Sequence, residues 1–480
     1  MLLASIFLPL LGGACLPLFR FRSRRARSLY TGLITLLTSC LVWAQILGGA
    51  RPEIRLLQMT DALSIVFRMD RLSVVFAGLI AFLWPIAVLY AHEYMAHEER
   101  ESSFFAWYTM SYGVTLAVAC AENYFTLYVF YELLTLVTMP LVLHKKDARS
   151  VHAARKYLYY SITGAALGFI GLIFLLTYGR VDFLPGGTLT PEAVSGLEGL
   201  LRLVFVLSFV GFGTKAALFP MHAWLPMASV APTPVTALLH AVAVVKAGAF
   251  AVIRLIDYSF GTWLLEGTWA QTVCLLLASF TIVYGSVMAV REQHLKRRLA
   301  YSTVSNLSYI LMGAALMTNA GLTGALTHLV FHALMKITLF YCAGAILVKT
   351  NREYVQEMRG LARVMPFTCA VFTFASLALT GVPPLLGFAS KWNLATAAID
   401  SGLIAGYVGA GALIVSAVLT AVYLLSVVVP MYARPLEGTL PAEKCDPGLP
   451  MKLSLGVLCL AMLVMSFSAA NVTEWLSHIL

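Results

Sequence analysis

The chain is a succession of long apolar segments separated by short polar connections. Most segments reach or exceed the roughly 20 apolar residues that a helix needs to cross a bilayer. We therefore predict an all-α polytopic membrane protein with about 14 transmembrane helices. The predicted spans cover residues 2–19, 28–49, 71–91, 103–120, 123–143, 156–178, 200–222, 230–256, 268–290, 299–317, 322–348, 364–400, 402–431 and 451–469.

Two of the predicted spans are interrupted by residues that break helices. The seventh span contains Lys215, and the twelfth, which is too long for one straight helix, contains Lys391. These spans lie five apart, and an odd number of spans per repeat makes successive repeats inverted. We therefore predict two inverted five-helix repeats, each with a broken helix. The predicted helix breaks are Pro220, Pro226, Pro232, Pro234, Gly381, Pro383 and Pro384.

A single transmembrane domain is expected over residues 1–480, because no soluble domain or low-complexity segment interrupts the pattern. Residues 51–70 alternate weakly between polar and apolar positions, which predicts an extended element on the outer face. The expected parts of the domain are the first three helices with this outer-face loop (1–102), the first inverted repeat (103–257), the second inverted repeat (268–431), and the last helix with the C-terminal tail (449–480).

The composition supports this interpretation. Hydrophobic residues make up 60% of the chain and charged residues only 12%, whereas soluble domains carry roughly 25% charged residues. The mean hydropathy is +0.83. A soluble enzyme, a disordered scaffold and a nucleic-acid-binding protein are therefore excluded as interpretations, even though the formal net charge is +10.

The basic residues predict the orientation in the membrane. Of 33 Lys and Arg residues, 22 lie in one set of alternate connections and seven in the other, which assigns the first set to the inside. We expect a prokaryotic inner (plasma) membrane with both termini on the outer side, and residues 1–18 as a first span instead of a cleaved signal peptide. The seven outer residues are Arg51, Arg55, Arg68, Arg71, Arg180, Arg202 and Arg254.

The cysteines indicate no redox centre. The eight cysteines form no CxxC motif and no cluster with histidine, so iron–sulfur, zinc and haem ligation have no support in the sequence. We expect no metal site and no cofactor on this chain.

Ionisable side chains near the middle of predicted spans are the strongest functional signal. Each costs at least about 2.5–3.5 kcal/mol to insert, and such residues are usually functional. They are expected to line a hydrated or mutually paired interior, and not to face lipid. The five residues of this kind are Glu132, Lys215, Lys246, Lys336 and Lys391.

The eleventh predicted span places His328, His332 and Lys336 on one helix face, at steps of four residues. Histidine changes its charge near neutral pH, so this spacing predicts a relay for protons. His240 is a further candidate. Two structural alternatives remain: a static Glu132–Lys215 ion pair, and a purely structural network along the stripe. The candidates other than His240 are called the ionisable row: Glu132, Lys215, Lys246, His328, His332, Lys336 and Lys391.

Several motifs resemble one known family in order and spacing. The longest runs from His222-Ala-Trp-Leu-Pro226 through Ala231-Pro-Thr-Pro and His240 to Val245-Lys246-Ala-Gly. The chain resembles the antiporter-like subunits shared by respiratory complex I, Mrp-type cation/proton antiporters and membrane-bound energy-converting hydrogenases. Further matching motifs are Phe130-Tyr-Glu132-Leu-Leu-Thr135, Arg298-Leu-Ala-Tyr-Ser-Thr-Val-Ser305, the stripe within 328–344, and Gly387-Phe-Ala-Ser-Lys391.

The resemblance implies 14 helices, two inverted repeats, and a central hydrophilic axis. It implies that Glu132 and Lys215 match the family's glutamate–lysine pair, that Lys246 matches the central lysine of the eighth helix, and that the stripe is the relay to Lys391. Lys391 stands where the fourth core subunit of complex I usually has a glutamate. The implied partners are other membrane subunits, including related antiporter-like subunits, together with the lipid bilayer and protons.

Three functions are compatible with these features. The first is proton translocation within a redox-driven complex whose redox centres lie on other chains. The second is a subunit of a sodium/proton antiporter, which would also move sodium. The third is a membrane enzyme acting on a lipid-like substrate, but no nucleophile, metal or phosphate-binding signature supports it. Between the first two the sequence hardly discriminates, because redox centres or antiporter partners would lie on other chains; we take the first as the prediction and keep the second as its alternative.

Overall fold

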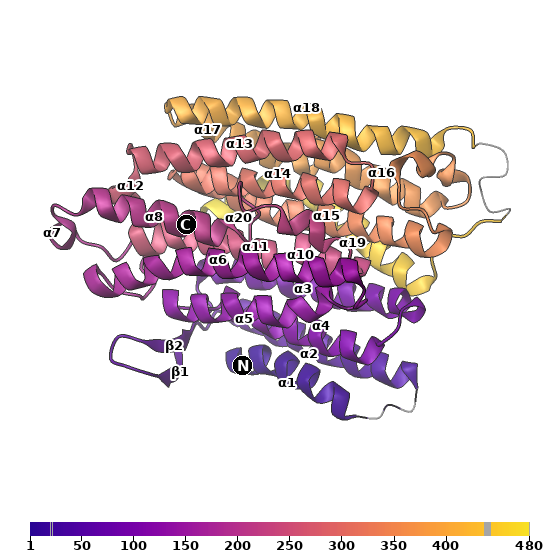
Figure 1. Cartoon of the computed structure of the whole chain (residues 1–480), viewed down its shortest axis with the longest axis horizontal. Helices are drawn as coiled ribbons and strands as arrows, with labels where there is room; N and C mark the ends of the chain where they lie inside the picture. The colour runs from indigo at the N-terminus through magenta and orange to yellow at the C-terminus, as the bar shows by residue number, and fades with distance from the viewer. Residues whose placement is uncertain (20, 22, 436–442, 480) are drawn as a thin grey trace.

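The computed structural model describes residues 1–19, 21, 23–435 and 443–479, and most of them are helical. Arg20 and Arg22, which the charge count assigned to the inner side, lie outside the described residues. The helices lie side by side with their axes roughly along one direction (Figure 1). The first elements are α1 (Leu2–Cys15), α2 (Arg24–Gly48), β1 (Ile54–Gln58), β2 (Ser64–Phe67), α3 (Arg71–Tyr94), α4 (Glu101–Ala119), α5 (Tyr124–Val142), α6 (Ala148–Tyr178) and α7 (Pro191–Val194).

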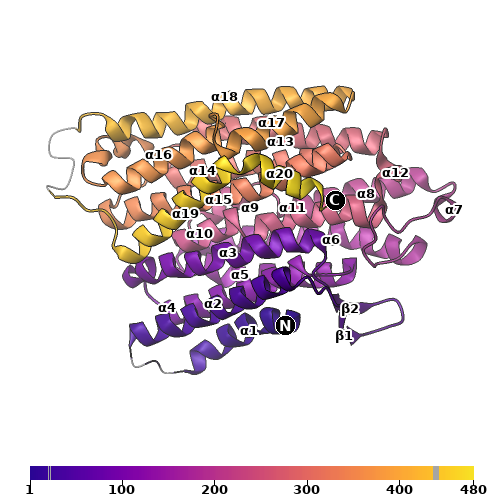
Figure 2. The same cartoon turned by 180° about the vertical axis from the view of Figure 1, so that it is seen from behind.

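The remaining helices complete the bundle. Figure 1 shows α1 and α2 at one edge and α18 at the opposite edge. In the reverse view, α19 and α20 cross the face (Figure 2), and they pack against α15. The helices that follow α7 are α8 (Glu198–Gly213), α9 (Trp224–Ala228), α10 (Thr233–Ala241), α11 (Val244–Arg254), α12 (Thr262–Leu265), α13 (Trp269–Arg291), α14 (Leu295–Ala315), α15 (Asn319–Thr350), α16 (Pro366–Thr380), α17 (Leu386–Asp400), α18 (Ile404–Tyr432), α19 (Leu449–Phe467) and α20 (Ala469–Ser477).

Within the described residues, nine helical segments are long and apolar enough to cross a membrane. The predicted count of about 14 is higher, because helices such as α8 and α16 are too short to qualify alone and α4 and α14 are long enough but not apolar enough. The protein is thus a helical, multi-pass membrane protein. The nine segments are 24–48, 71–97, 124–142, 148–178, 233–260, 269–291, 319–350, 404–432 and 449–467.

Two of these segments form the centre of the molecule. The segment made by α10 and α11 is wholly buried, and 94% of the most apolar stretch of α15 is buried. A helix that is apolar on all sides is stable only when other helices surround it. The ionisable side chains of these two segments therefore face protein, and α15 packs against α10, α14, α16 and α17.

The extended element predicted for residues 51–70 is a two-stranded antiparallel hairpin of β1 and β2. It lies at the same end of the molecule as α7 and α12 (Figure 1). Ile54 pairs with Phe67, and Val66 accepts a backbone hydrogen bond from Glu122 in the connection between α4 and α5. The hydrogen bond between Glu122 and Val66 fixes the hairpin against the helical bundle.

The helix breaks are only partly where the sequence placed them. Gly381, Pro383 and Pro384 lie between α16 and α17, and Gly381 ends α16 in the left-handed conformation at φ 93°. Pro220 lies in the turn between α8 and α9. Such positions suit residues that cannot continue a helix.

Three other prolines are placed differently from the prediction. Pro226 lies within α9, Pro232 caps α10, and Pro234 lies in the first turn of α10. Proline is tolerated in a first turn because its missing N–H would have no helical partner there. Pro232 and Pro234 therefore start a helix instead of breaking one.

Candidate functional site

The first part of the site is a lysine in the turn that follows α8. The Lys215 ammonium donates hydrogen bonds to the backbone carbonyl of Tyr131 and, at 3.3 Å, to a carboxylate oxygen of Glu132. It also lies 3.5 Å from the centre of the Tyr131 ring. The Lys215 side chain is 1% exposed and that of Glu132 is 25% exposed. The structure therefore brings together the pair that the sequence singled out, with one partner buried and the other half-buried.

Two aromatic side chains hold this turn in position. The Trp224 indole donates to the Thr214 carbonyl at 2.8 Å, and the Tyr131 hydroxyl donates to the Phe212 carbonyl at 2.8 Å. These bonds satisfy carbonyls at the end of α8 that lack helical partners. A Cβ at Gly248 would come within 2.8 Å of the Lys215 carbonyl carbon. Glycine at this position therefore lets α11 approach the turn directly.

The second part of the site links α11 to α15. Lys246 and His332 share a hydrogen bond of 2.9 Å between the ammonium and the imidazole Nδ1, and both side chains are fully buried. The rings of His332 and His328 stack with centres 5.5 Å apart. His328 in turn bonds to the Ser390 hydroxyl at 3.0 Å through its Nδ1. Two histidines thus connect Lys246 to α17.

Lys336 continues the stripe but turns toward α14. Its ammonium donates to the Leu299 carbonyl at 2.9 Å and to the Ser302 hydroxyl. Both partners belong to α14, whereas His332, one helical turn earlier on α15, bonds to Lys246 of α11. His240 packs against Phe340 with ring centres 4.9 Å apart, and neither of its ring nitrogens has a hydrogen-bond partner among the described residues.

Lys391 lies in α17, and its ammonium reaches the break between α16 and α17. Its ammonium donates to the carbonyls of Leu379 at 2.7 Å and Thr380 at 3.0 Å, which are the last two residues of α16. Free carbonyls give a helix C-terminus partial negative charge, so a cation is stable there. The ammonium also lies 5.8 Å from the centre of the Tyr309 ring. The helix break therefore creates the binding site of the lysine.

Sequence reasoning missed a cluster of buried hydroxyls beside the stripe. Ser416 bonds to Ser286 at 2.6 Å, to Ser305 at 3.0 Å and to the Tyr309 hydroxyl at 2.7 Å. The Tyr309 ring lies 5.0 Å from the ring of His328. Ser305 and Tyr309 are four residues apart on one face of an apolar helix, and this spacing was a usable signal.

A second missed group lies near the hairpin. Arg254, which the charge count treated as a loop residue, is fully buried and makes two hydrogen bonds of 2.7 Å to the Asp70 carboxylate. Arg68 pairs with Glu122 nearby. The sequence could not reveal these pairs because their members come from distant parts of the chain.

Two residues counted in an inner connection are also buried. The Lys296 ammonium donates to the Ala231 carbonyl at 3.2 Å. The Arg298 guanidinium donates to the Tyr423 carbonyl at 3.0 Å and to the Ser426 hydroxyl at 2.7 Å. The prediction that Lys296 and Arg298 lie in a connection is therefore wrong. The reason is that α14 begins at Leu295, earlier than the predicted residue 299, and tertiary packing encloses its first turn.

The arrangement is suited to exchanging protons between bases. The ionisable row combines a carboxylate, four ammonium groups and two imidazoles within the helical bundle. His328 and His332 each keep one ring nitrogen without a hydrogen-bond partner in the part of the chain that the structure describes. In that same part, no group of three or more His, Cys, Asp or Glu residues could hold a metal ion.

The helical membrane fold and its buried ionisable groups define a polytopic membrane protein with a polar interior. The family profile described as "NADH:quinone oxidoreductase/Mrp antiporter, TM" matches residues 121–420. A second profile, described as "NADH-Ubiquinone oxidoreductase (complex I), chain 5 N-terminus", matches residues 57–105. The chain therefore belongs to this family of antiporter-like membrane subunits.

Individual relatives come from several kinds of complex. NADH-quinone oxidoreductase subunit N of Desulforudis audaxviator is 34% identical over 378 residues, which cover 77% of this chain and 74% of the relative. A probable K(+)/H(+) antiporter protein of Rhizobium meliloti is 33% identical, over 84% of this chain and 40% of its own length. Hydrogenase-4 component B of Escherichia coli is 34% identical, over 68% of this chain and 50% of its own length. The chain thus spans half or less of the last two relatives.

Solved structures show the same fold. A chain of the archaeal membrane-bound sulfane sulfur reductase, a respiratory membrane complex, superposes with a TM-score of 0.85 at 21% identity, covering 100% of this chain and 97% of that one. A chain of the Mrp complex from Dietzia superposes with a TM-score of 0.84 at 22% identity, covering 99% and 96%. Both similar chains belong to membrane complexes.

Proposed function

We propose that the chain is a proton-translocating, antiporter-like subunit of a multi-subunit energy-converting membrane complex, of the complex I or membrane-bound hydrogenase type. Protons move along the ionisable row. The observation that carries the proposal is the buried hydrogen bond between Lys246 and His332, because it joins the two central helical segments through groups that exchange protons. The family membership and the respiratory relatives support it.

The proposal includes a repeated architecture. About 14 transmembrane helices would form two inverted five-helix repeats over 103–257 and 268–431, with both termini on the outer side. Lys215 follows the end of α8, and Lys391 lies against the end of α16. Two lysines at corresponding helix breaks support the repeat, since broken helices in matching positions mark transport paths.

Charge on one member of the row would control its neighbours. At an effective dielectric near 20, a unit charge about 7 Å away changes a neighbour's energy by about 2–2.5 kcal/mol. Movement of Lys215 relative to Glu132 would therefore shift the proton occupancy of Lys246 and then of the histidines. Electron transfer would take place on other subunits of the complex, which couple to this chain through such charge movements.

A second candidate is a subunit of an Mrp-type sodium/proton antiporter. The antiporter protein of Rhizobium meliloti and the Mrp complex of Dietzia favour it as strongly as the respiratory relatives favour the first. The genes beside this one distinguish the two functions. Genes for iron–sulfur and NiFe or flavin subunits indicate a redox complex, and genes for several small antiporter subunits indicate the second function.

Replacement of two lysines tests whether the row is a single path. We expect Lys336→Ala and Lys391→Ala each to reduce proton translocation by the reconstituted complex, measured with a pH-sensitive dye in vesicles. The double variant should be little worse than the poorer single variant, because residues in series are not additive. Lys444→Ala, which replaces an exposed lysine, is the matched control.

The outcome is informative only for assembled complexes, so subunit content is measured for each variant. Full translocation by the double variant would exclude this path. Strictly additive losses would indicate two parallel paths through Lys336 and Lys391.

A further inference from the structure

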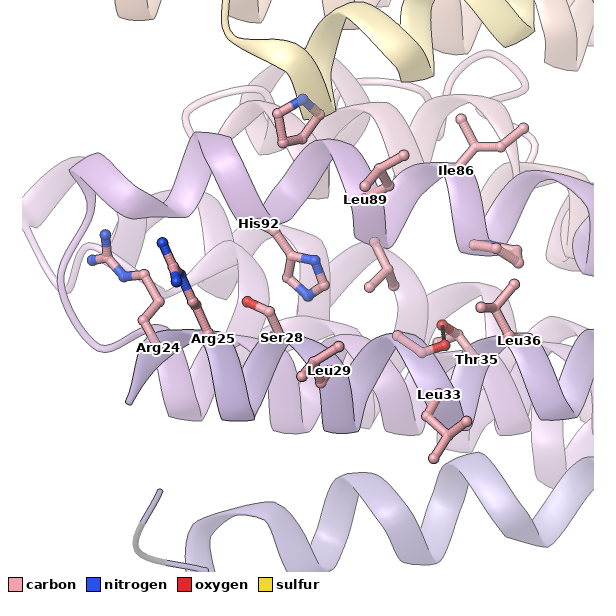
Figure 3. Close-up of a pocket in the computed structure, with 14 residues that line it drawn as sticks. Arg24, Arg25, Ser28, Leu29, Leu33, Thr35, Leu36, Ile86, Leu89 and His92 are labelled. Carbon is pink, nitrogen blue, oxygen red and sulfur yellow. Dashed lines mark hydrogen bonds between the residues drawn. The ribbon is translucent and has the colours of Figure 1, made fainter. Parts of the chain in front are cut away.

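An apolar groove of about 950 Å³ lies between α2 and α3, and Pro450 at the start of α19 closes one side. Figure 3 shows Leu29, Leu33 and Leu36 along α2 and Ile86 and Leu89 along α3, and all five line the groove. The groove is far from the ionisable row in the fold, because α2 lies at the edge of the bundle (Figure 1). No member of the ionisable row lines the groove.

The walls of the groove suit hydrocarbon chains. Leu29 is 74% exposed, Leu33 58% and Leu36 54%. In a membrane-spanning helix such leucines contact lipid tails. The lining from Arg25 to Leu36 covers about 16 Å of helix rise, which is close to half of the roughly 30 Å hydrocarbon core. The groove therefore has the length of an acyl chain in one leaflet.

Positive charge lies at one end of the groove. Arg24 and Arg25 extend from the first turn of α2 at that end, and His92 points from α3 toward α2 (Figure 3). Glu101 pairs with Arg24, which holds that guanidinium in place. Arg25 is exposed and forms no ion pair within the part of the chain that the structure describes. An anionic headgroup at this end would meet a guanidinium that is free to bind it.

A second hollow on the same helices has apolar walls but, among the described residues, no basic residue at its end. It has a volume of about 300 Å³ and lies farther along the same helices, between Trp43, Phe82 and Trp475. None of the described residues that line it is charged. The groove beside Arg25, in contrast, combines the length of an acyl chain with basic residues at the headgroup level.

We propose that this groove is a binding site for an anionic phospholipid. The acyl chains lie along the leucines of α2, and the phosphate binds Arg25 with Arg24 and His92 nearby. Basic residues at the predicted inner ends of transmembrane helices recognise anionic lipids of that leaflet. The guanidinium group suits a phosphate, because its N–H donors match two oxygens at once.

Replacement of the free arginine tests the charge. The full chain is extracted in a mild detergent and titrated with phosphatidylglycerol or phosphatidylcholine, and bound lipids are counted by native mass spectrometry. We expect Arg25→Gln to weaken phosphatidylglycerol binding about fivefold and phosphatidylcholine binding less, because the choline ammonium offsets the charge of its phosphate. Arg149→Gln, an exposed arginine that does not line the groove, should change neither.

A second variant tests the groove itself. A Cβ at Gly32 would meet no heavy atom within 4 Å, so Gly32→Phe fills the groove without disturbing the fold. We expect it to remove binding of both lipids. Gly411 on α18 also has free space around it and does not line the groove. Gly411→Phe should therefore retain the lipid.

Two outcomes would overturn the proposal. The first is unchanged phosphatidylglycerol binding in both Arg25→Gln and Gly32→Phe. The second concerns the occupant in the native membrane, where a photo-reactive benzoylphenylalanine at Leu33 is expected to cross-link to a phospholipid. A cross-link to another polypeptide instead would assign the groove to a protein partner.

Discussion

At the scale of single residues, Glu122 is the carboxylate whose environment predicts a pH effect. It lies between α4 and α5, paired with Arg68, and its second carboxylate oxygen has no partner among the described residues. Burial raises the pKa of Glu122 from 4.5 to about 7, although Arg68 opposes this shift. The folded chain therefore binds more protons than the unfolded chain between these two pH values.

The contribution of Glu122 to the free energy of unfolding should consequently be fully present below pH 4.5 and be lost as the pH rises through about 7. We expect thermal unfolding in detergent to show this fall, and Glu122→Gln to diminish it. Glu266→Gln, which changes an exposed carboxylate, should leave the profile intact. An unchanged profile in Glu122→Gln would show that another group causes the pH dependence.

Ionisable residues within apolar spans identified the main candidates of the site. The structure adds the interaction partners of these residues, only some of which could be predicted from the sequence. Glu132 and Lys215 could be paired in advance because both lie near the middle of their spans. The partners of Lys391 are backbone carbonyls of α16, which no residue type signals. The burial of Arg254 depends on packing between distant segments, so a charge count placed it in a loop.

At the scale of helices, the hydroxyl cluster between α13, α14 and α18 is predicted to contribute to stability and not to the proton path. Tyr309→Phe removes one hydrogen bond to Ser416 but keeps the ring beside His328. We expect a loss of about 1 kcal/mol in stability, because Ser416 keeps its bonds to Ser286 and Ser305. Proton flux should remain within about twofold of the wild type, since the proposed path uses imidazole and ammonium groups.

The matched control is Tyr407→Phe, an exposed tyrosine on α18. Thermal unfolding and dye-detected proton flux are measured for both variants. A much larger loss of flux in Tyr309→Phe than in the control would place the hydroxyl cluster within the path.

The helix breaks show how far local sequence determines an element. The break between α16 and α17 follows from Gly381, Pro383 and Pro384, whose backbone preferences are strong. The interruption between α10 and α11 at Val242 and Ala243 was not predicted. No glycine or proline lies there, so tertiary packing must impose this irregular backbone.

At the scale of the whole molecule, the charge asymmetry predicts which side each connection faces. Single cysteines replacing Arg149 or Arg291 should react with a membrane-impermeant reagent only from the inside, and one replacing Arg55 only from the outside. All three positions are exposed. The exposed native Cys40 is first replaced by serine. Labelling of Arg291→Cys from outside would reverse the proposed orientation.

The overall class of the protein was predictable because bilayer thickness sets a span length that any long apolar segment reveals. The family could be identified because several motifs occur in order around Lys246 and Lys391. The groove between α2 and α3 could not be foreseen. It depends on how α2, α3 and the start of α19 pack together, and neither the leucines of α2 nor Arg25 distinguish a groove from an ordinary lipid-facing surface.

The ion pair of Asp70 and Arg254 joins residues 184 positions apart, and this separation sets an order for biogenesis. Chains are synthesised from the N-terminus, so α3 enters the membrane with a carboxylate whose partner has not yet been made. Asp70, at the start of α3, can gain this partner only after α11 has been made. A chain that stops before Arg254 would therefore leave an incomplete N-terminal unit for membrane quality-control proteases to remove.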